Sequence, residues 1–345
     1  MLLIRADASV TIGTGHIMRC LALAQAWRNR IGPVKFLCAC IPDNLLKRLN
    51  DEAFEVVTSD TVPGSDDDLD RLLEIQDQEA ATYLMVDGYQ FDDNFQTHLS
   101  TSTARTLFLD DYGHCKRYDA DWILNQNLGA DSSFYDNRSE RTKLLLGSSY
   151  ALLRQEFLRL GGQSFYLNSP IENVLITLGG SDPQNLTLSV LTALTCLKCR
   201  PLKVRVVLGA GNPHSEEFSN IVDSIHEIEV LTNVYDMASL MRWADIAICS
   251  GGSTNWEFAY FGTPRVVLIQ ADNQVAATQE LEKAGCVQLI DARKSLDLDR
   301  LMTQFYSLAN SSSLIHKMSN ANKLLVDGQG VNRILTQIYH GEVPL

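Results

Sequence analysis

The sequence lacks both the long apolar run of a membrane protein and the basic excess of a nucleic-acid binder. No stretch of its 345 residues approaches the ~20 consecutive apolar residues that span a bilayer. Lys and Arg number 29 against 42 Asp and Glu, a formal charge of −13. A general nucleic-acid binder needs a basic surface to displace counterions, so that class is excluded. Anionic small ligands are not excluded, because backbone N–H groups bind phosphate without lysine.

Signals for export, metal binding and several enzyme classes are missing as well. The N-terminal MLLIRADASV has no basic region and is interrupted by Arg5 and Asp7, so we expect no signal peptide. Cys196 and Cys199 form a C-x-x-C, but no second cysteine pair or histidine pair follows at zinc spacing. The sequence also contains no P-loop, G-x-S-x-G or H-E-x-x-H. We therefore expect a reduced, cytoplasmic protein whose chemistry needs no metal and no cofactor.

Hydrophobic residues make up 45% of the chain and fall into short runs that alternate with helical patterns. Such alternation predicts an α/β fold with parallel sheets and helices on both faces. The length suits two domains. The predicted strands are 2–6, 34–40, 83–87 and 106–110 in the first half, and 173–180, 204–211, 244–252 and 264–270 in the second.

The stretch 158–170 separates the two series of strands and is the predicted linker. We therefore expect a first domain over 1–160 and a second over 171–345. The tail from about residue 296 is helical by pattern, and part of it is expected to pack back on the first domain. Two such domains in succession predict a cleft between the carboxyl ends of two sheets, where loops that lead into helices bind ligands.

The motif I-G-T-G-H (12–16) follows the first predicted strand. Gly13 and Gly15 permit close approach of backbone to a ligand. His16 would begin the next helix, where the helix dipole favours a neutral imidazole that accepts a proton. The alternative is a histidine that only caps or packs the helix. The full G-x-G-x-x-G spacing is absent, which disfavours nicotinamide binding.

Two glycine turns follow predicted strands of the second domain. In L-G-G-S-D (178–182), the N–H groups around Gly180 and Ser181 could hold a phosphate, or Ser181 or Asp182 could simply cap the next helix. The motif S-G-G-S-T-N-W-E (250–257) is more specific. Its N–H groups at Gly252, Ser253 and Thr254 suit a diphosphate, and Glu257 lies one turn further on, where a carboxylate can bind a ribose diol. The alternative is a helix cap with a favourable glutamate.

Further polar clusters follow neighbouring strands. Asn273 and Gln274 stand at a predicted helix start after strand 264–270, where a capping role is the alternative. Asp87 ends strand 83–87 and Tyr89 follows it, and both are expected to point outward where a substrate meets them. The clusters at 109–114 and 125–127 occupy similar positions. A strand-end aspartate is often only a turn former, but three polar clusters at one edge favour a site.

Several of these motifs, taken in order, resemble one family. R-A-D-A-S…I-G-T-G-H-I-M-R-C (5–20), V-D-G-Y (86–89), L-D-D-Y (109–112), L-G-G-S-D and S-G-G-S-T-N-W-E are similar to the motifs of the UDP-2,4-diacetamido-2,4,6-trideoxy-β-L-altropyranose hydrolases of pseudaminic acid biosynthesis. The resemblance covers roughly residues 3–285. The motifs are also similar to those of the glycosyltransferase that adds N-acetylglucosamine to lipid I. It implies the GT-B fold, two Rossmann-like domains with the nucleotide on the second.

The resemblance also implies roles for individual residues. His16 matches the catalytic histidine, Asp87 and Tyr89 match a D-x-Y pair near the attacking water, and Glu257 matches the ribose-binding glutamate. Gly88 departs from the D-H-Y of some relatives, and nothing after about residue 290 can be matched.

The resemblance thus implies inverting hydrolysis of a UDP-linked diacetamido trideoxy sugar. We expect a monomer without a membrane or nucleic-acid partner. The alternatives are a GT-B glycosyltransferase with the same donor site, or a nucleotide-sugar binding protein without turnover. The absence of an obvious basic amphipathic helix disfavours a lipid acceptor.

Overall fold

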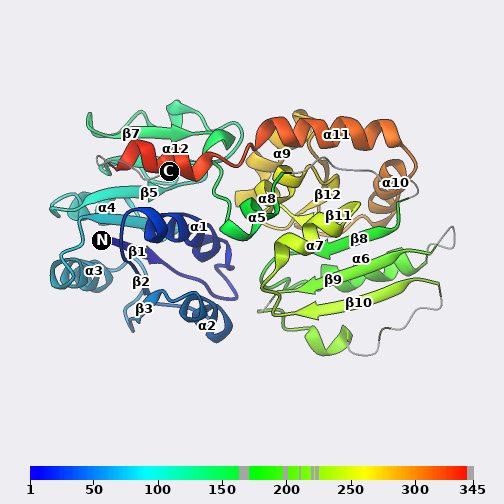
Figure 1. The fold of residues 1–345 in the computed structure, drawn as a ribbon, viewed down its shortest axis with the longest axis horizontal. Helices are drawn as coiled ribbons and strands as arrows, with labels where there is room; N and C mark the ends of the chain where they lie inside the picture. The colour runs from blue at the N-terminus through cyan, green and yellow to red at the C-terminus, as the bar shows by residue number, and fades with distance from the viewer. Residues whose placement is uncertain (163–170, 197–200, 210, 219–220, 222–224, 340–345) are drawn as a thin grey trace. The chain divides into compact units, whose positions relative to one another are not determined.

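The computed structural model describes residues 1–162, 171–196, 201–209, 211–218, 221 and 225–339 (Figure 1). They form two compact units, unit 1 with Met1–Gln155 and Gly328–Leu345, and unit 2 with Glu156–Asp327. Most of the predicted linker 158–170, and Cys199 of the C-x-x-C, lie outside the described residues.

Unit 1 contains a sheet of seven strands that all run parallel, in the order β3-β2-β1-β4-β5-β6-β7. The central strands are continuous apolar runs because both faces of the sheet are covered by helices. The strands are β1 (Leu2–Ala6), β2 (Val34–Cys38), β3 (Glu55–Thr58), β4 (Tyr83–Asp87), β5 (Arg105–Leu109), β6 (Trp122–Asn125) and β7 (Lys143–Leu146). The helices are α1 (Gly15–Arg30), α2 (Asp43–Asp51), α3 (Asp66–Gln78), α4 (Asp93–Leu99) and α12 (Gly330–Ile338), with 3-10 turns η1 (Ser132–Tyr135) and η2 (Ser148–Tyr150).

Side chains of β1 alternate between two cores, one on each face of the sheet. Leu2 and Ile4 pack in the core that includes α1, α2 and α12, whereas Leu3 packs in the core that includes α3 and α4. Helix α12 belongs to unit 1 because its apolar face, which includes Ile334 and Leu335, completes the first of these cores. This helix packs on the first unit, as expected for part of the tail, although the predicted second domain runs to residue 345, and unit 1 ends at Gln155 rather than at residue 160.

Unit 2 contains a sheet of six parallel strands in the order β10-β9-β8-β11-β12-β13. The strands are β8 (Asn173–Thr177), β9 (Lys203–Leu208), β10 (Glu227–Thr232), β11 (Ile246–Ser250), β12 (Arg265–Ile269) and β13 (Gln288–Asp291). The helices are α5 (Gln155–Leu160), α6 (Leu186–Thr195), α7 (Met237–Trp243), α8 (Thr254–Phe261), α9 (Val275–Lys283), α10 (Leu298–Ala309) and α11 (Ser312–Leu325), with 3-10 turns η3 (Ser215–Phe218) and η4 (Asp272–Gln274).

The two sheets repeat one topology. Counted from the start of each unit, the first six strands follow the order 3-2-1-4-5-6 of a doubly wound nucleotide-binding fold. In such a sheet the connections leave in opposite directions at one point, which opens a crevice at the carboxyl ends of the two strands there. That point lies between β1 and β4 in unit 1 and between β8 and β11 in unit 2. The predicted pair of parallel α/β sheets is confirmed.

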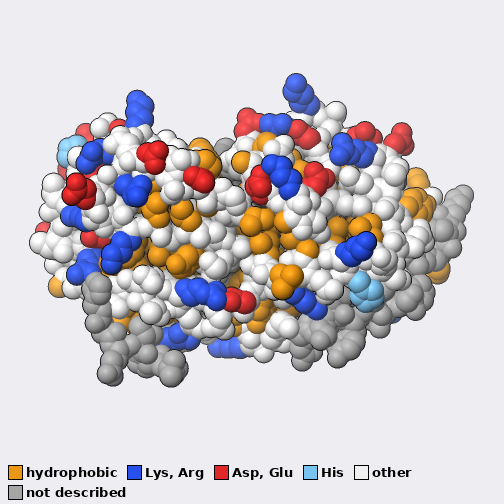
Figure 2. All heavy atoms as spheres, turned by 90° about the horizontal axis from the view of Figure 1, so that it is seen from above, with side chains coloured by type: hydrophobic (Ala, Val, Ile, Leu, Met, Phe, Trp, Pro, Cys, Tyr) orange, Lys and Arg blue, Asp and Glu red, His pale blue; other side chains and the backbone are white. Residues whose placement is uncertain are grey.

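The surface carries charges of both signs. Figure 2 shows acidic side chains among the basic ones over both units. Of the helices in the described ranges, none is both long enough and apolar enough to span a bilayer.

Candidate functional site

The loop between β1 and α1 lies at the switch point of unit 1. Gly13 adopts a φ of +80° and its N–H donates to Ser9 O at 2.8 Å, which closes a turn just before the helix. Helix α1 then begins at Gly15, so His16 lies in its first turn. Because β1 pairs with β4 with Ala6 opposite Asp87, this turn stands beside the carboxyl end of β4.

His16 and Asp87 form a buried pair at that place. The Nδ1 atom of His16 lies 2.6 Å from Asp87 Oδ1. Asp87 is 0% exposed and His16 is 7% exposed. Within the described ranges no hydrogen bond uses the other ring nitrogen of His16, Nε2. Asp87 therefore fixes the histidine ring through Nδ1, and Nε2 remains available for other chemistry.

Arg19 joins His16 and Asp87 at this place, and the sequence analysis missed it. Its Nε and Nη2 atoms donate to the two oxygen atoms of Asp87, both at 2.6 Å, and its Nη1 donates to Asp111 at 2.7 Å. Residues three apart share a helix face, so the spacing H-x-x-R was the available signal. Both carboxylates lie at the ends of other strands, which the helix pattern alone does not identify.

The charge of Asp87 follows from these contacts. Burial opposes ionisation of Asp87, but the adjacent Arg19 and His16 outweigh that effect and hold the pKa of the carboxyl well below its usual range. An ionised Asp87 accepts a hydrogen bond from Nδ1–H of His16, which leaves Nε2 as a proton acceptor. The prediction that Asp87 points outward to meet the substrate is wrong, because its side chain is enclosed beneath His16 and Arg19.

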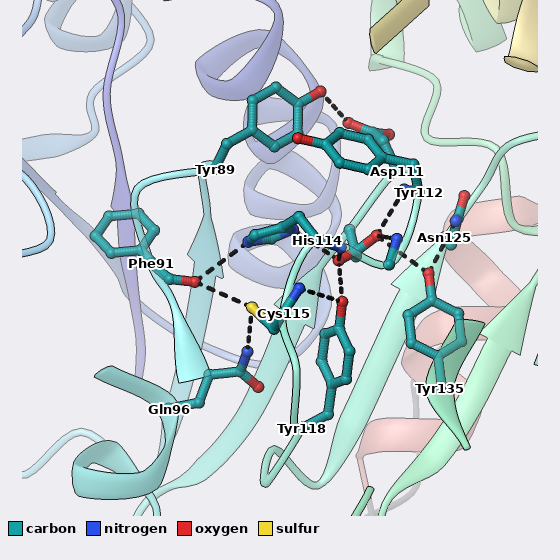
Figure 3. Close-up of polar contacts among 12 residues, drawn as sticks. Tyr89, Phe91, Gln96, Asp111, Tyr112, His114, Cys115, Tyr118, Asn125 and Tyr135 are labelled. Carbon is teal, nitrogen blue, oxygen red and sulfur yellow. Dashed lines mark hydrogen bonds and ion pairs between the residues drawn. The ribbon is translucent and has the colours of Figure 1, made fainter. Parts of the chain in front are cut away.

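Tyr89 contacts both His16 and Asp111 of this cluster. Its ring meets the ring of His16 edge-on, with centroids 5.0 Å apart. Its hydroxyl donates to Asp111 at 2.6 Å, and Asn127 donates to the same carboxylate at 3.0 Å (Figure 3 shows the tyrosine contact). The polar clusters after β4, β5 and β6 therefore meet at one edge, as the sequence predicts.

Asp110 fixes the loop that carries Asp111. Its carboxylate accepts from the N–H groups of Tyr112 and Gly113, at 2.7 and 2.5 Å, and from the hydroxyl of Tyr118 at 2.6 Å. Burial disfavours the charge, but the hydrogen bonds and His114 lower the pKa of Asp110 to about 2. The cluster at 109–114 is thus partly a turn former, as its alternative interpretation held.

His114 is clamped within the same loop (Figure 3). Its Nε2 lies 3.2 Å from Phe91 O, and its Nδ1 lies 2.8 Å from Asp110 Oδ2, within ion-pair distance. Burial opposes the positive charge, but Asp110 raises the pKa of His114 to about 10. Both nitrogens face acceptors, so this ring is an imidazolium that stabilises the loop.

In unit 2 the corresponding turn follows β11. Helix α8 begins at Thr254, and the side chain of Ser253 does not cap it. The first helical turn is tight, with Asn255 N donating to Gly252 O at 3.1 Å. In the part of the chain that the structure describes, the N–H groups of Gly252, Ser253 and Thr254 have no acceptor. Free amide groups and the positive end of a helix dipole form a ready anion site.

The other predicted residues of this site lie at different depths. Glu257 is in α8 and 9% exposed. Gln274, at the end of η4, lies against the turn, because a Cβ on Gly251 would be 2.9 Å from Gln274 Cβ. Asn273 is exposed in η4.

The turn after β8 is adjacent to this site, because β8 pairs with β11. Gly179 there has a φ of +93° and stands close to the hydroxyl of Ser250. Asp182 accepts from the N–H groups of Leu186 and Thr187 at 2.9 and 2.8 Å. The capping alternative is therefore correct for Asp182 and α6, and Gly180 and Ser181 remain as the candidates for phosphate contact.

Comparisons of sequence identify relatives of the whole chain. Residues 173–334 match the glycosyltransferase family 28 C-terminal domain. The chain is 26% identical to the uncharacterized protein MJ1062 of Methanocaldococcus jannaschii, over 98% of this chain and 70% of that protein. It is 25% identical to the UDP-2,4-diacetamido-2,4,6-trideoxy-β-L-altropyranose hydrolase of Campylobacter jejuni, over 82% of this chain and 96% of the hydrolase.

Comparison of structures shows the fold. The MurG protein of Acinetobacter baumannii superposes with a TM-score of 0.64 at 16% identity, and the match covers 98% of each chain. The predicted GT-B fold is confirmed by this likeness and by the two parallel sheets. The chain is therefore a two-domain protein of GT-B fold, whose residues 173–334 are similar to the glycosyltransferase family 28 C-terminal domain and which has a UDP-sugar hydrolase among its homologues.

Proposed function

We propose that the protein hydrolyses a UDP-linked 2,4-diacetamido-2,4,6-trideoxy sugar to UDP and the free sugar. The observation that carries the proposal is His16, whose Nδ1 rests on the buried, ionised Asp87 and whose Nε2 is free to accept a proton. The homology to a hydrolase of that name supports the substrate. The family 28 domain supports a nucleotide sugar as the reactant.

His16 is the general base of the proposed reaction. Its Nε2 takes a proton from a water molecule while the water oxygen attacks the anomeric carbon. The bond between that carbon and the diphosphate oxygen breaks, so UDP leaves with the electron pair. Attack opposite the leaving group inverts the anomeric centre. Asp87 and Arg19 hold the tautomer and orientation of the ring, and the edge-on contact with Tyr89 limits its movement.

The turn before α8 is the proposed site for UDP. The N–H groups of Gly252, Ser253 and Thr254 stabilise the charge that develops on the diphosphate, so no metal is required in this proposal. Gly180 and Ser181 of the adjacent turn add phosphate contacts. Glu257 accepts hydrogen bonds from the ribose, which a nearly buried carboxylate does well.

The His16→Ala variant tests the proposal directly. Removal of a general base typically costs about 10²–10⁴ in rate, so kcat should fall by that range while KM changes little. The measurement is UDP release from the UDP sugar in a buffer with EDTA, with the product identified by NMR. His98→Ala is the matched control, because His98 is an exposed histidine of α4 in the same unit. Near-native turnover by a folded His16→Ala protein would remove His16 from the mechanism.

The family 28 domain also favours a second candidate, a glycosyltransferase with the same donor site. Both activities release UDP, but only hydrolysis produces free sugar in the absence of an acceptor. Incubation without acceptor therefore separates them. A protein that binds UDP sugars and never turns them over would show affinity alone, and His16→Ala would then change nothing.

A further inference from the structure

Arg265 is a buried cation whose partners are all uncharged. It is the first residue of β12 and 0% exposed. Its Nε donates to Asn255 Oδ1 at 2.7 Å, Nη2 donates to Asn255 O at 3.1 Å, and Nη1 donates to Asn322 Oδ1 at 2.9 Å and Thr263 O at 3.2 Å. Every hydrogen bond of this guanidinium in the described residues therefore ends on a neutral oxygen atom.

The buried arginines of unit 1 are different. Arg5 pairs with Asp7 and Asp68, and Arg19 pairs with Asp87 and Asp111. A buried charge is costly unless an opposite charge compensates it. Burial lowers the pKa of Arg265, but an arginine keeps its charge in proteins. The countercharge of Arg265 is thus not supplied by a carboxylate within hydrogen-bonding distance of the guanidinium.

Asn255 connects Arg265 to the turn before α8. Because Arg265 holds the amide oxygen of Asn255, the amide nitrogen is the end that faces the turn. This nitrogen donates to Ser250 O at 2.9 Å and to Gly252 O at 3.0 Å. In a trans peptide the C=O of one residue and the N–H of the next point in opposite directions. Holding the carbonyl group of Gly252 inward therefore directs the N–H group of Ser253 outward.

We propose that Arg265 is the buried positioning cation of a nucleoside diphosphate site at this turn. It orients the outward N–H group of Ser253 through Asn255, and its uncompensated charge favours an anion in front of α8. The diphosphate supplies the missing countercharge. The inference rests on the nucleotide site of the proposed function, but it does not depend on hydrolysis. It specifies that affinity comes from the phosphates rather than from the nucleoside.

The test compares UDP with uridine, which lacks the phosphates. We expect Arg265→Met to weaken UDP binding at least tenfold and uridine binding less than twofold, and Arg265→Lys to recover part of the loss. UDP affinity is measured by calorimetry and uridine affinity by NMR titration. Arg205→Met is the matched control, because Arg205 belongs to the same sheet and pairs with Glu229. Unchanged UDP binding, or equal weakening of both ligands, overturns the inference and assigns Arg265 a purely structural role.

Asn255→Asp provides a second test, which is decisive even when Arg265→Met does not fold. The variant gives Arg265 a carboxylate partner of nearly the same shape and removes the amide donor to the turn. It should fold and lose UDP affinity at least tenfold with uridine affinity retained, and full UDP affinity would refute the inference. Wild-type protein that binds no UDP refutes both this inference and the proposed function. Wild-type protein that binds UDP without hydrolysing the sugar refutes only the hydrolase.

Discussion

At the scale of single residues, two histidines of unit 1 stand beside buried carboxylates and differ in their second nitrogen. His114 has acceptors at both nitrogens, the carbonyl of Phe91 and the carboxylate of Asp110, and it holds a proton on each. His16 has its carboxylate at Nδ1 only, and that carboxylate already pairs with Arg19. The first arrangement stabilises a loop. The second leaves a nitrogen that can exchange protons with a reactant.

Asp87→Asn tests whether Asp87 acts through His16. The asparagine amide has one acceptor oxygen and no charge, so Nδ1 of His16 loses its ionised acceptor. The ring of His16 is then no longer held in the Nδ1–H tautomer. We expect kcat to fall about 10²–10⁴-fold, comparable to the loss of the base itself, with little change in KM. Asp119→Asn is the control, because Asp119 is also a buried carboxylate paired with an arginine, Arg117. A rise in KM with unchanged kcat would instead assign Asp87 to substrate binding.

The sequence identified the parts of the site that lie in contiguous motifs. His16 begins a helix, Asp87 ends a strand and Tyr89 follows that strand, so their local pattern carries the signal. The contact of Arg19 with Asp111 joins residues 92 positions apart. Likewise, no local pattern predicts that Arg265 reaches Asn255. Long-range pairing of charges depends on the strand order, which the pattern of each strand does not contain.

At the scale of elements, the predicted strands are the continuous apolar runs, which occupy the interior of each sheet. The strands that the sequence analysis did not predict include all four edges, β3, β7, β10 and β13. Edge strands are exposed and carry polar residues, as EVVT in β3 and EIEVLT in β10 show. These two strands therefore lack the apolar run that marks a strand covered on both faces.

The turn after β8 packs backbone against backbone on Gly209, which follows β9 and leaves no space for a Cβ atom. A Cβ at this position would lie 2.3 Å from the carbonyl oxygen atoms of both Gly179 and Gly180. Backbone atoms cannot rotate away, so Gly209→Ala should destabilise the protein by about 1–3 kcal/mol and displace the turn after β8. Urea denaturation measures the first effect, and UDP affinity should fall with it. Gly32→Ala is the control, because no atom lies within 4 Å of its Cβ position. Equal stability of the two variants would contradict this packing argument.

At the scale of the whole molecule, each unit contains a doubly wound sheet, and the C-terminal helix α12 packs on the first unit. The sequence predicts two α/β units because the alternation of strands and helices restarts near residue 171. It does not locate the crossing at Asp327, since α11 and α12 are both amphipathic helices without a strand signal. Their assignment depends on which core has a vacant face, and α12 completes the core that contains α1.

The stability of the fold should depend on pH through His114. Its pKa is about 10 in the folded protein and about 6.5 when unfolded. The raised value means that folding favours the protonated form, so the stabilisation is complete below about pH 6.5 and is lost as the pH rises toward 10. His114→Gln removes it while it retains a donor for Phe91 O. We expect the difference in Tm between wild type and variant to be largest at pH 6, smaller at pH 8 and small at pH 10, as thermal unfolding at these values measures. A difference that stays constant from pH 6 to pH 10 would show that His114 is uncharged in the folded protein, because other groups that titrate in this range are common to both proteins and cancel.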